Sequence, residues 1–327
     1  MKKKALTAAL AAAFALTTDG SVFADPLEFN GQISYQHREN TDTNPKNAAN
    51  DDFTNNIFKV ILNAKAANVL DNVDLYFRFG GERVTDVGSG RDFNRAYYGK
   101  DSRSAFALDQ FGFVYKAGGF AYKIGRQDLT IGATALLYNN DGNVGKHNFV
   151  DGVTITGKSG ITDLKIVGAQ ADSVSDDNDK VYAISASYPA TKALTLGATV
   201  AKYDSATDPV KDSIVYAVNA NYAISSKLGA FGEFARSDAS DKNTAFDVGL
   251  NYDFNNKTSA YVITHKTEKN ADLGENTDFE NNEKGWYYGV NHKLTKDSTL
   301  KFFYKDNKYL DGSGKETSFR TTYVYKF

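Results

Sequence analysis

The fold class is decided by one short stretch of the chain, residues 246–254, which reads FDVGLNYDF. Phenylalanine, valine, leucine and tyrosine occupy every second position, and aspartate, glycine and asparagine occupy the positions between them. Because side chains alternate between the two faces of a β-strand, this stretch has one wholly apolar face and one small or polar face. Residues 27–36 and 214–222 show the same alternation, with Gly31 among the apolar positions of the first.

Alternating stretches of about ten residues recur along the rest of the chain, which is typical of a membrane barrel. We predict an all-β fold, a transmembrane antiparallel β-barrel of about 16 strands. The expected strand centres are Ile33, Ile61, Phe77, Phe111, Tyr122, Ile155, Ile166, Ile184, Ala198, Val218, Phe231, Leu250, Val262, Tyr288, Phe303 and Tyr323.

The connections between these strands alternate between short and long. The short turns contain Gly, Asn, Asp and Ser, residue types that suit tight hairpins. They lie at 71–72, 118–119, 159–160, 190–191, 225–226, 255–256 and 296–297. The long connections are polar and lie at 37–55, 81–105, 127–150, 171–180, 203–212, 236–243, 266–284 and 306–316. An even strand number places both termini on one side, so we predict short periplasmic turns and long extracellular loops.

A soluble β-sandwich would also show alternating strands, with its apolar face turned inward. Two features favour the membrane barrel instead. The connections alternate strictly in length, and the apolar faces carry aromatic residues near their ends, as the girdles of membrane barrels do. The composition agrees, because the chain has 20 Tyr and 22 Phe but only 4 Pro and no Cys.

The first residues resemble an export signal. Lys2, Lys3 and Lys4 precede an apolar run over 5–16, and residues 22–24 read Val-Phe-Ala. We therefore expect residues 1–24 to be a cleaved signal peptide and residues 25–327 to form the barrel domain, although Asp19 and Gly20 interrupt the pattern. The alternative is a hydrophobic helix that is retained. Removal of residues 1–24 changes the formal net charge from −2 to −4, which argues against a nucleic-acid partner.

The C-terminal strand places Tyr323, Tyr325 and Phe327 on one face. A terminal aromatic residue on an alternating last strand is similar to the assembly signal of bacterial outer-membrane barrels. The chain also resembles the Gram-negative general (diffusion) porin family over residues 25–327. The pieces that carry this resemblance are LEFNGQISY at 27–35, IGRQD at 124–128 and YVYKF at 323–327.

The resemblance implies a homotrimer of sixteen-stranded outer-membrane barrels, each with its third loop folded into the pore. The connection 127–150 falls in the position of that loop, but it lacks the Pro-Glu-Phe-Gly-Gly type of sequence that many members carry there. The implied function is passive diffusion of small polar solutes and ions through a water-filled channel. The implied partners are the lipid bilayer and, through the last strand, the outer-membrane assembly machinery.

A channel needs charged groups along its lumen rather than catalytic residues. The alternation places seven bases on the lumen side: Arg38, Lys59, Lys65, Arg78, Lys123, Lys301 and Arg320. The resemblance adds Arg126, and it implies acidic partners on the third loop, for which Asp128 and Asp141 are the candidates, with Asp151 at the far end. Aromatic residues expected at the lipid interface are Trp286, Tyr288, Tyr216, Tyr222 and Phe254.

Other functions remain as alternatives. A channel selective for sugars, phosphate or carboxylates would need a continuous lumen track of bases or aromatics, whereas the bases here are scattered. A surface adhesin or structural barrel would need a binding surface on its loops, and a hydrolase would need a Ser–His pair. We predict no enzyme activity and no cofactor. We also predict no metal site, because the histidines lie on separate segments at His37, His147, His265 and His292.

Overall fold

A computed structural model describes residues 27–44, 52–85, 104–141, 144–145, 149–171, 178–208 and 211–327. The predicted signal peptide, residues 1–24, lies outside these ranges. No helix among the described residues is long and apolar enough to cross a membrane.

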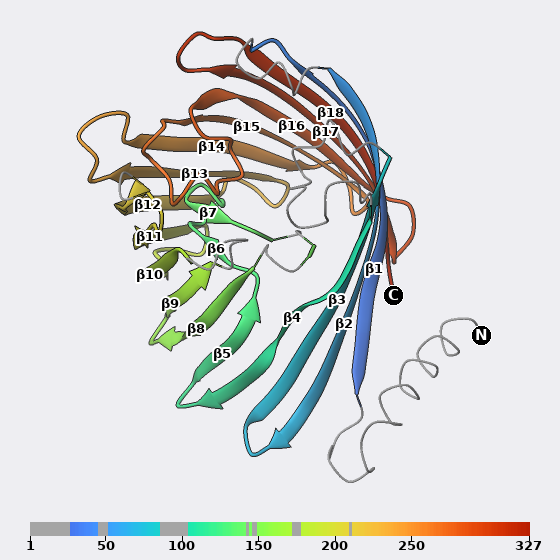
Figure 1. Cartoon of the computed structure of the whole chain (residues 1–327), viewed down its shortest axis with the longest axis vertical. Helices are drawn as coiled ribbons and strands as arrows, with labels where there is room; N and C mark the ends of the chain where they lie inside the picture. The colour runs from blue at the N-terminus through green and yellow to red at the C-terminus, as the bar shows by residue number, and fades with distance from the viewer. Residues whose placement is uncertain are drawn as a thin grey trace.

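Sixteen strands of the described chain form one closed antiparallel barrel (Figure 1). Each strand pairs with its neighbours in sequence order, as the alternation of hairpins predicts. The strands are β1 (Glu28–Asp42), β2 (Phe53–Leu70), β3 (Val73–Val84), β4 (Ser104–Ala117), β5 (Phe120–Gln127), β8 (Val150–Ser159), β9 (Thr162–Ala171), β10 (Lys180–Pro189), β11 (Leu194–Asp204), β12 (Ser213–Ala223), β13 (Leu228–Ser237), β14 (Thr244–Asp253), β15 (Thr258–Thr267), β16 (Glu283–Lys293), β17 (Ser298–Tyr309) and β18 (Lys315–Lys326).

The barrel closes where the first strand pairs with the last. Phe327 and Gly31 exchange two backbone hydrogen bonds, each 3.0 Å from nitrogen to oxygen. A Cβ atom at position 31 would lie 2.7 Å from the ring of Phe327, so only glycine leaves room for this ring. The glycine that interrupts the apolar face of the first strand therefore has a packing role at the seam.

The two faces of the wall differ as the alternation predicts. In the deciding stretch, Val248 and Leu250 are exposed on the outer face, whereas Asp247 is fully buried on the inner face. The same holds on β12, where Val218 is 58% exposed and Val215 is fully buried. An outer surface this apolar is the expected surface for contact with lipid.

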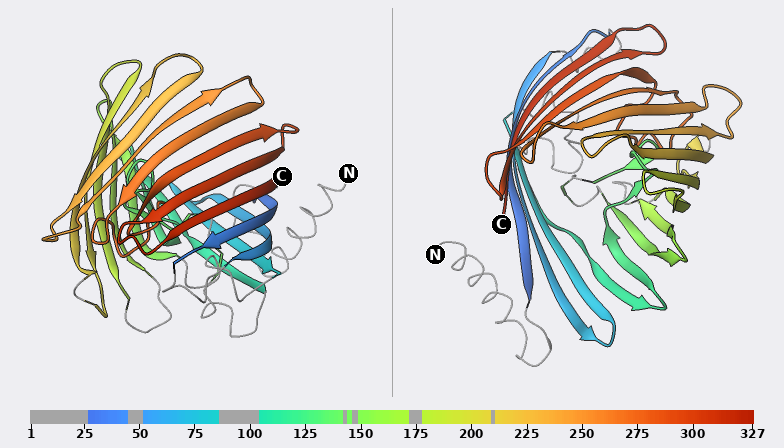
Figure 2. Two further views of the ribbon diagram at one scale, coloured as in Figure 1. Left: turned by 90° about the horizontal axis from the view of Figure 1, so that it is seen from above. Right: turned by 180° about the vertical axis from the view of Figure 1, so that it is seen from behind.

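A small hairpin, β6 (Thr130–Ile131) and β7 (Tyr138–Asn139), lies in the connection between β5 and β8. Figures 1 and 2 show this hairpin in green, inside the curve of the large sheet. The sequence predicted an inward third loop only through the family resemblance.

The predicted strand centres all lie within barrel strands, and the predicted short turns all fall at hairpins. The strands are longer than predicted at the long-loop end: β1 continues to Asp42 and β2 begins at Phe53, so the first long connection is shorter than 37–55. Apart from Phe53, these extensions are polar on both faces, so they carry too little alternation to have revealed them.

Candidate pore and constriction

The third loop leaves the wall at the end of β5 and turns inward. Gln127 is 1% exposed, and its side-chain amide donates to the carbonyl oxygens of Lys123 and Gly152 at 3.2 and 3.1 Å. Within the loop, Asn140 accepts a hydrogen bond from the Leu129 amide and donates one from its own amide to the Leu129 carbonyl. These bonds satisfy backbone groups that the loop has withdrawn from the barrel ladder.

An apolar surface inside the barrel holds the loop in place. Leu136 and Leu137 are fully buried, together with Leu129, Ile131 and Tyr138. They pack against a patch of mostly small inner-wall residues from β9 to β14. This alanine patch comprises Ala169, Ala183, Ala201, Ala217, Ala235 and Ala245. Small side chains leave the space that the loop occupies, so one side of the lumen is a dry core and not a wet channel wall.

Two acidic residues tether the tip of the loop. Glu233 and Asp247 lie directly opposite each other on β13 and β14. The hydroxyl of Thr134 lies 2.9 Å from Glu233 and 2.5 Å from Asp247, and the Thr134 amide donates to Glu233 at 3.1 Å. Gly132 has φ +91°, and a Cβ there would lie 2.7 Å from the Glu233 carboxylate. On the far side, Lys165 donates to the carbonyl oxygen of Thr130 at 2.7 Å.

Replacement of Thr134 by valine should loosen this tether. The valine removes the hydroxyl and leaves two buried carboxylates against a methyl group, which costs about 1–3 kcal/mol of loop attachment. We expect greater open-channel current noise in single-channel recordings of Thr134→Val. Thr41→Val, an exposed threonine on β1, is the control and should behave as wild type. Open-channel current noise equal to that of the wild type in Thr134→Val would show that these hydrogen bonds do not hold the loop.

A second loop, residues 268–282 between β15 and β16, also packs inward. Its Leu273 amide donates to the Leu137 carbonyl at 3.0 Å, and its Asp278 amide donates to the Ala135 carbonyl at 3.2 Å. Ala271 and Leu273 are fully buried, and Phe279 stacks on Tyr287 of the wall with ring centroids 5.6 Å apart. The sequence predicted this segment only as a long extracellular loop. It instead braces the third loop within the barrel.

The packing of this second loop should depend on pH. Burial raises the pKa of the Asp272 carboxyl to about 7, partly opposed by hydrogen bonds from Asn281 and Glu275. Because the pKa in the folded state lies above the unfolded value of about 3.9, ionisation favours the released loop. The packed loop is therefore most stable below about pH 4 and loses about 1.4 kcal/mol per pH unit up to about pH 7.

Hydrogen exchange at the Leu273 amide, corrected for the intrinsic pH dependence of exchange, measures this effect. Protection should fall between pH 5 and pH 7 in the wild type. In Asp272→Asn, which cannot ionise, protection should not change over that range. Equal pH dependence in both proteins would contradict the assignment to Asp272.

The two inward loops bring acidic groups to one side of the lumen. Asp141 is exposed on the third loop, and Asp278 accepts a hydrogen bond from Asn139 at 2.8 Å. Burial raises the pKa of the Asp278 carboxyl, and the charges of Glu280 and Asp141 raise it further, whereas the hydrogen bond from Asn139 and the positive charge of Arg320 lower it. Arg320, on the inner face of β18, therefore lies within electrostatic reach of this acidic side.

The predicted pairing of wall bases with loop acids is present at one contact. Lys123 on the inner face of β5 lies 2.9 Å from Asp128, the first residue of the third loop, and 5.0 Å from the ring centre of Tyr76. Burial raises the pKa of the Asp128 carboxyl, but the attraction and hydrogen bond of Lys123 outweigh it and hold the pKa below its ordinary value.

Other predicted lumen bases lie on the inner face but bind partners on the wall itself. Arg78 makes a two-fold hydrogen bond to Asp109 of β4 at 2.9 and 3.0 Å and lies 4.7 Å from the ring centre of Phe149. Lys59 pairs with Glu82 at 2.8 Å. Arg38 is 2% exposed and lies over the ring of Phe53.

The placement of Arg126 in the pore, taken from the family resemblance, is wrong. Arg126 lies opposite Phe111 and Asp151 in the ladder, on the outer face of the wall. It forms a two-fold pair with Asp151, at 3.1 and 2.7 Å. Strand alternation alone gives this orientation, because Tyr122 and Ile124 precede it on the same strand at alternating positions. Asp151, at the far end of the third loop, also lies on the outer face, because it is directly opposite Arg126 in the ladder.

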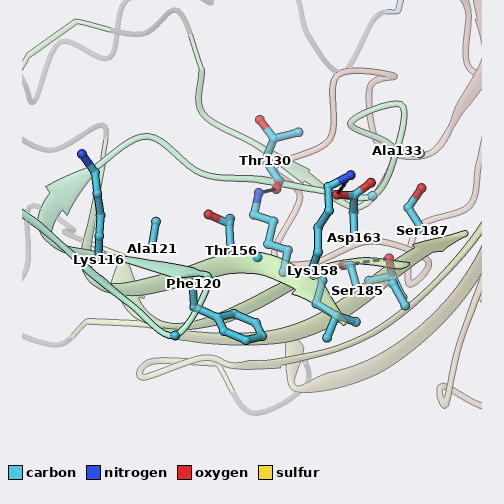
Figure 3. Close-up of a pocket in the computed structure, with 18 of the residues that line it drawn as sticks. Lys116, Phe120, Ala121, Thr130, Ala133, Thr156, Lys158, Asp163, Ser185 and Ser187 are labelled. Carbon is cyan, nitrogen blue, oxygen red and sulfur yellow. Dashed lines mark hydrogen bonds and ion pairs between the residues drawn. The ribbon is translucent and has the colours of Figure 1, made fainter. Parts of the chain in front are cut away.

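A cavity of about 1090 Å³ lies between the third loop and the short-turn end of the barrel. Its walls are mostly inner-face residues of β4 to β12, and Thr130, Gly132 and Ala133 of the loop form one boundary. Figure 3 shows Lys116, Lys158 and Asp163 around this cavity. The cavity is the part of the lumen that the third loop leaves open on this side.

The expected interface aromatics all lie on the outer face. Trp286, Tyr288 and Tyr323 are exposed, as are Tyr216, Tyr222 and Phe254. Trp286 stacks on Tyr288, which stacks in turn on Tyr304. Tyr325 and Phe327 are half-buried at the seam and stack on each other with ring centroids 6.5 Å apart.

Sequence reasoning missed the residues that seat the loop. The alanine patch could have been found, because the inner positions of β9 to β14 are apolar where a wet lumen wall is normally polar. The cross-strand pair Glu233 and Asp247 also left a signal, since two like charges opposite each other need a partner. The contacts of residues 268–282 left none, because they join backbone groups distant in sequence.

No protein-family model and no curated protein matches the chain. Among solved structures, the chain is similar to variants of the porin of Rhodopseudomonas blastica. One multiple mutant is 12% identical with a TM-score of 0.60, over 92% of this chain and 100% of that chain. Another mutant is 13% identical with a TM-score of 0.60 and the same coverage. A triple mutant is 12% identical with a TM-score of 0.59. The closed sixteen-stranded barrel and this structural similarity together show that the chain has the porin fold.

Proposed function

We propose that the protein is an outer-membrane porin, a water-filled channel for passive diffusion of small polar solutes and ions, and not an enzyme. The observation that supports this most is the division of the wall. Its outer face is apolar with exposed aromatics, and its inner face carries charged groups around a lumen narrowed by the third loop. Charges on two sides of a narrow lumen set a field across it, which favours polar over apolar solutes.

A planar lipid bilayer tests this function directly. The purified protein should insert in discrete current steps, and the current should rise in proportion to voltage and to salt concentration. Insertion without any current steps would contradict the proposal and favour a structural or adhesin role for the barrel.

Export and location follow from the same proposal. Residues 1–24 act as a signal peptide that is removed, and the apolar outer face then places the barrel in the outer membrane. N-terminal sequencing of the protein isolated from membranes should begin at Asp25. The short turns then face the periplasm and the long loops face the exterior.

A homotrimer is the proposed assembly. The outer face of β4, β5 and β8 carries the Arg126–Asp151 pair beside Phe111. An ion pair is costly against lipid, so this surface suits contact with another protein copy. Native mass spectrometry should give three times the mass of one chain. The last strand, with Phe327 at its end, is the proposed recognition element for the outer-membrane assembly machinery.

A channel selective for phosphate or carboxylates is the second candidate, and the open cavity favours it over a sugar channel. Lys116, Lys158 and Lys165 line this cavity. Its one lining carboxylate, Asp163, pairs with Lys158, and Lys116 shares Asp74 with Lys65, so the cavity keeps a net positive charge. The reversal potential in a salt gradient should then show an anion preference, which Lys116→Gln/Lys165→Gln should reduce. Equal reversal potentials for both proteins would leave the general porin as the assignment.

A further inference from the structure

Four lysines form a continuous row on the outer face at the long-loop end of the barrel. Lys266 of β15 lies opposite Lys284 of β16, Lys284 lies opposite Lys308 of β17, and Lys308 lies opposite Lys315 of β18. Directly opposed residues on one sheet face have Cβ atoms about 5 Å apart, and like charges in such pairs destabilise the sheet. We call Lys266, Lys284, Lys308 and Lys315 the lysine row.

The protein neutralises only the ends of this row. Lys266 lies 2.6 Å from Glu268, and Lys315 lies 3.8 Å from Asp306. Glu268 also accepts hydrogen bonds from the amide and the hydroxyl of Thr244. Lys284 and Lys308 are exposed, and no carboxylate among the described residues pairs with either of them. The two central lysines therefore have a surplus of positive charge.

The position of the row indicates what neutralises it. Trp286 lies two residues along β16 from Lys284 on the outer face. It stacks on Tyr288, which stacks on Tyr304 of β17, and all three side chains are exposed. This stacked aromatic group is where a membrane barrel meets the headgroup layer. A groove of about 360 Å³ opens there, lined by Lys266, Lys284 and Lys308 with Trp286 and Phe246, and Asp306 is the one carboxylate among its lining residues. Three lysines against one carboxylate leave the groove a net positive charge, which together with its apolar walls suits a ligand with acyl chains and a phosphate.

We propose that the lysine row binds the phosphate groups of a phosphorylated glycolipid in the outer leaflet, with its acyl chains against the aromatic group. This inference rests on the proposed outer-membrane location, but not on conduction. Lysine ammonium groups are strong point-charge partners for phosphate. The ligand supplies the negative charge that the wall lacks between the two ends of the row.

Native mass spectrometry of the protein in nonionic detergent, with diphosphoryl lipid A as the probe, tests this site. Wild-type protein should retain the phosphorylated lipid and release its dephosphorylated form. Lys284→Gln/Lys308→Gln should bind the phosphorylated lipid about tenfold or more weakly, because each lysine near such a surface contributes substantially to anion binding. Lys284→Arg/Lys308→Arg should keep the binding and show that the barrel tolerates change there.

The matched control is Lys202→Gln. Lys202 lies on the outer face at the long-loop end of β11, but it is opposite Tyr182 and Ile214 and pairs with Asp204 at 2.7 Å. It should bind the lipid as wild type does. Equal loss in this control, equal binding of the dephosphorylated lipid, or displacement by inorganic phosphate alone would overturn the proposal.

The channel function is measured separately on the same proteins. The lysine row lies outside the lumen, so Lys284→Gln/Lys308→Gln should insert in bilayers with wild-type conductance. If the wild-type protein binds the lipid but carries no current, the porin function fails and the lipid site stands. If it conducts but binds no lipid, the lipid site fails alone.

Discussion

Single-channel conductance should rise several-fold when Leu136 and Leu137 are both replaced by serine. Both side chains are fully buried between the third loop and the alanine patch of the inner wall. Truncation of one buried leucine to alanine costs about 2–5 kcal/mol, and serine adds an unpaired hydroxyl. The paired substitution therefore removes most of the apolar attachment of the loop, and the freed lumen carries more current.

The comparison protein for this experiment is Asp141→Asn, because Asp141 is exposed on the same loop. That change removes one lumen charge and leaves the seat of the loop intact. It should shift ion preference slightly and leave conductance close to wild type. If Leu136→Ser/Leu137→Ser conducts as the wild type does, the third loop is not the constriction.

The largest loss of stability is expected for Arg78→Met. Arg78 and Asp109 form a two-fold hydrogen-bonded pair in which the side chains are 9% and 0% exposed. Removal of one partner leaves a buried carboxylate without its counter-charge, which costs about 3–5 kcal/mol. Urea titration of the folded barrel in detergent measures this loss.

The double variant Arg78→Met/Asp109→Leu distinguishes the cost of an unpaired buried charge from a general disturbance of the packing. An apolar pair of similar size is often as stable as the ion pair it replaces, so the double variant should recover most of the loss. Lys158→Met is the matched single change on the inner face, since both Lys158 and Asp163 are exposed in their ion pair, and it should cost much less. A double variant as unstable as Arg78→Met would contradict the charge argument.

Most of the barrel could be predicted from sequence because each strand carries its own signal. The period-two pattern that begins at Phe246 fixes which side chains face outward, and the same rule places Lys123 and Arg320 inside. The pairing of Phe327 with Gly31 was not predicted; the structure explains the glycine among the apolar positions of the first strand by this contact at the seam.

The constriction could be predicted only in part. Asp128 follows β5 directly, so its contact with Lys123 of that strand could be expected from sequence. The surface against which Leu137 packs comes from strands far away in sequence, so that contact could not. The family resemblance places Arg126 in the pore, whereas the alternation of its own strand places it on the outer face, where it lies. No local pattern marks residues 268–282 as a brace, because the acceptors of the backbone hydrogen bonds from Leu273 and Asp278 belong to the third loop, which is distant in sequence.

The channel function depends on which face of the wall meets water. The chain has no cysteine, so a single introduced thiol is a unique probe. Thr156 lines the open cavity, whereas Val218 is exposed on the outer face. A charged, membrane-impermeant thiol reagent added during single-channel recording should lower the current through Thr156→Cys and leave Val218→Cys unchanged. A current that falls for Val218→Cys and not for Thr156→Cys would contradict it.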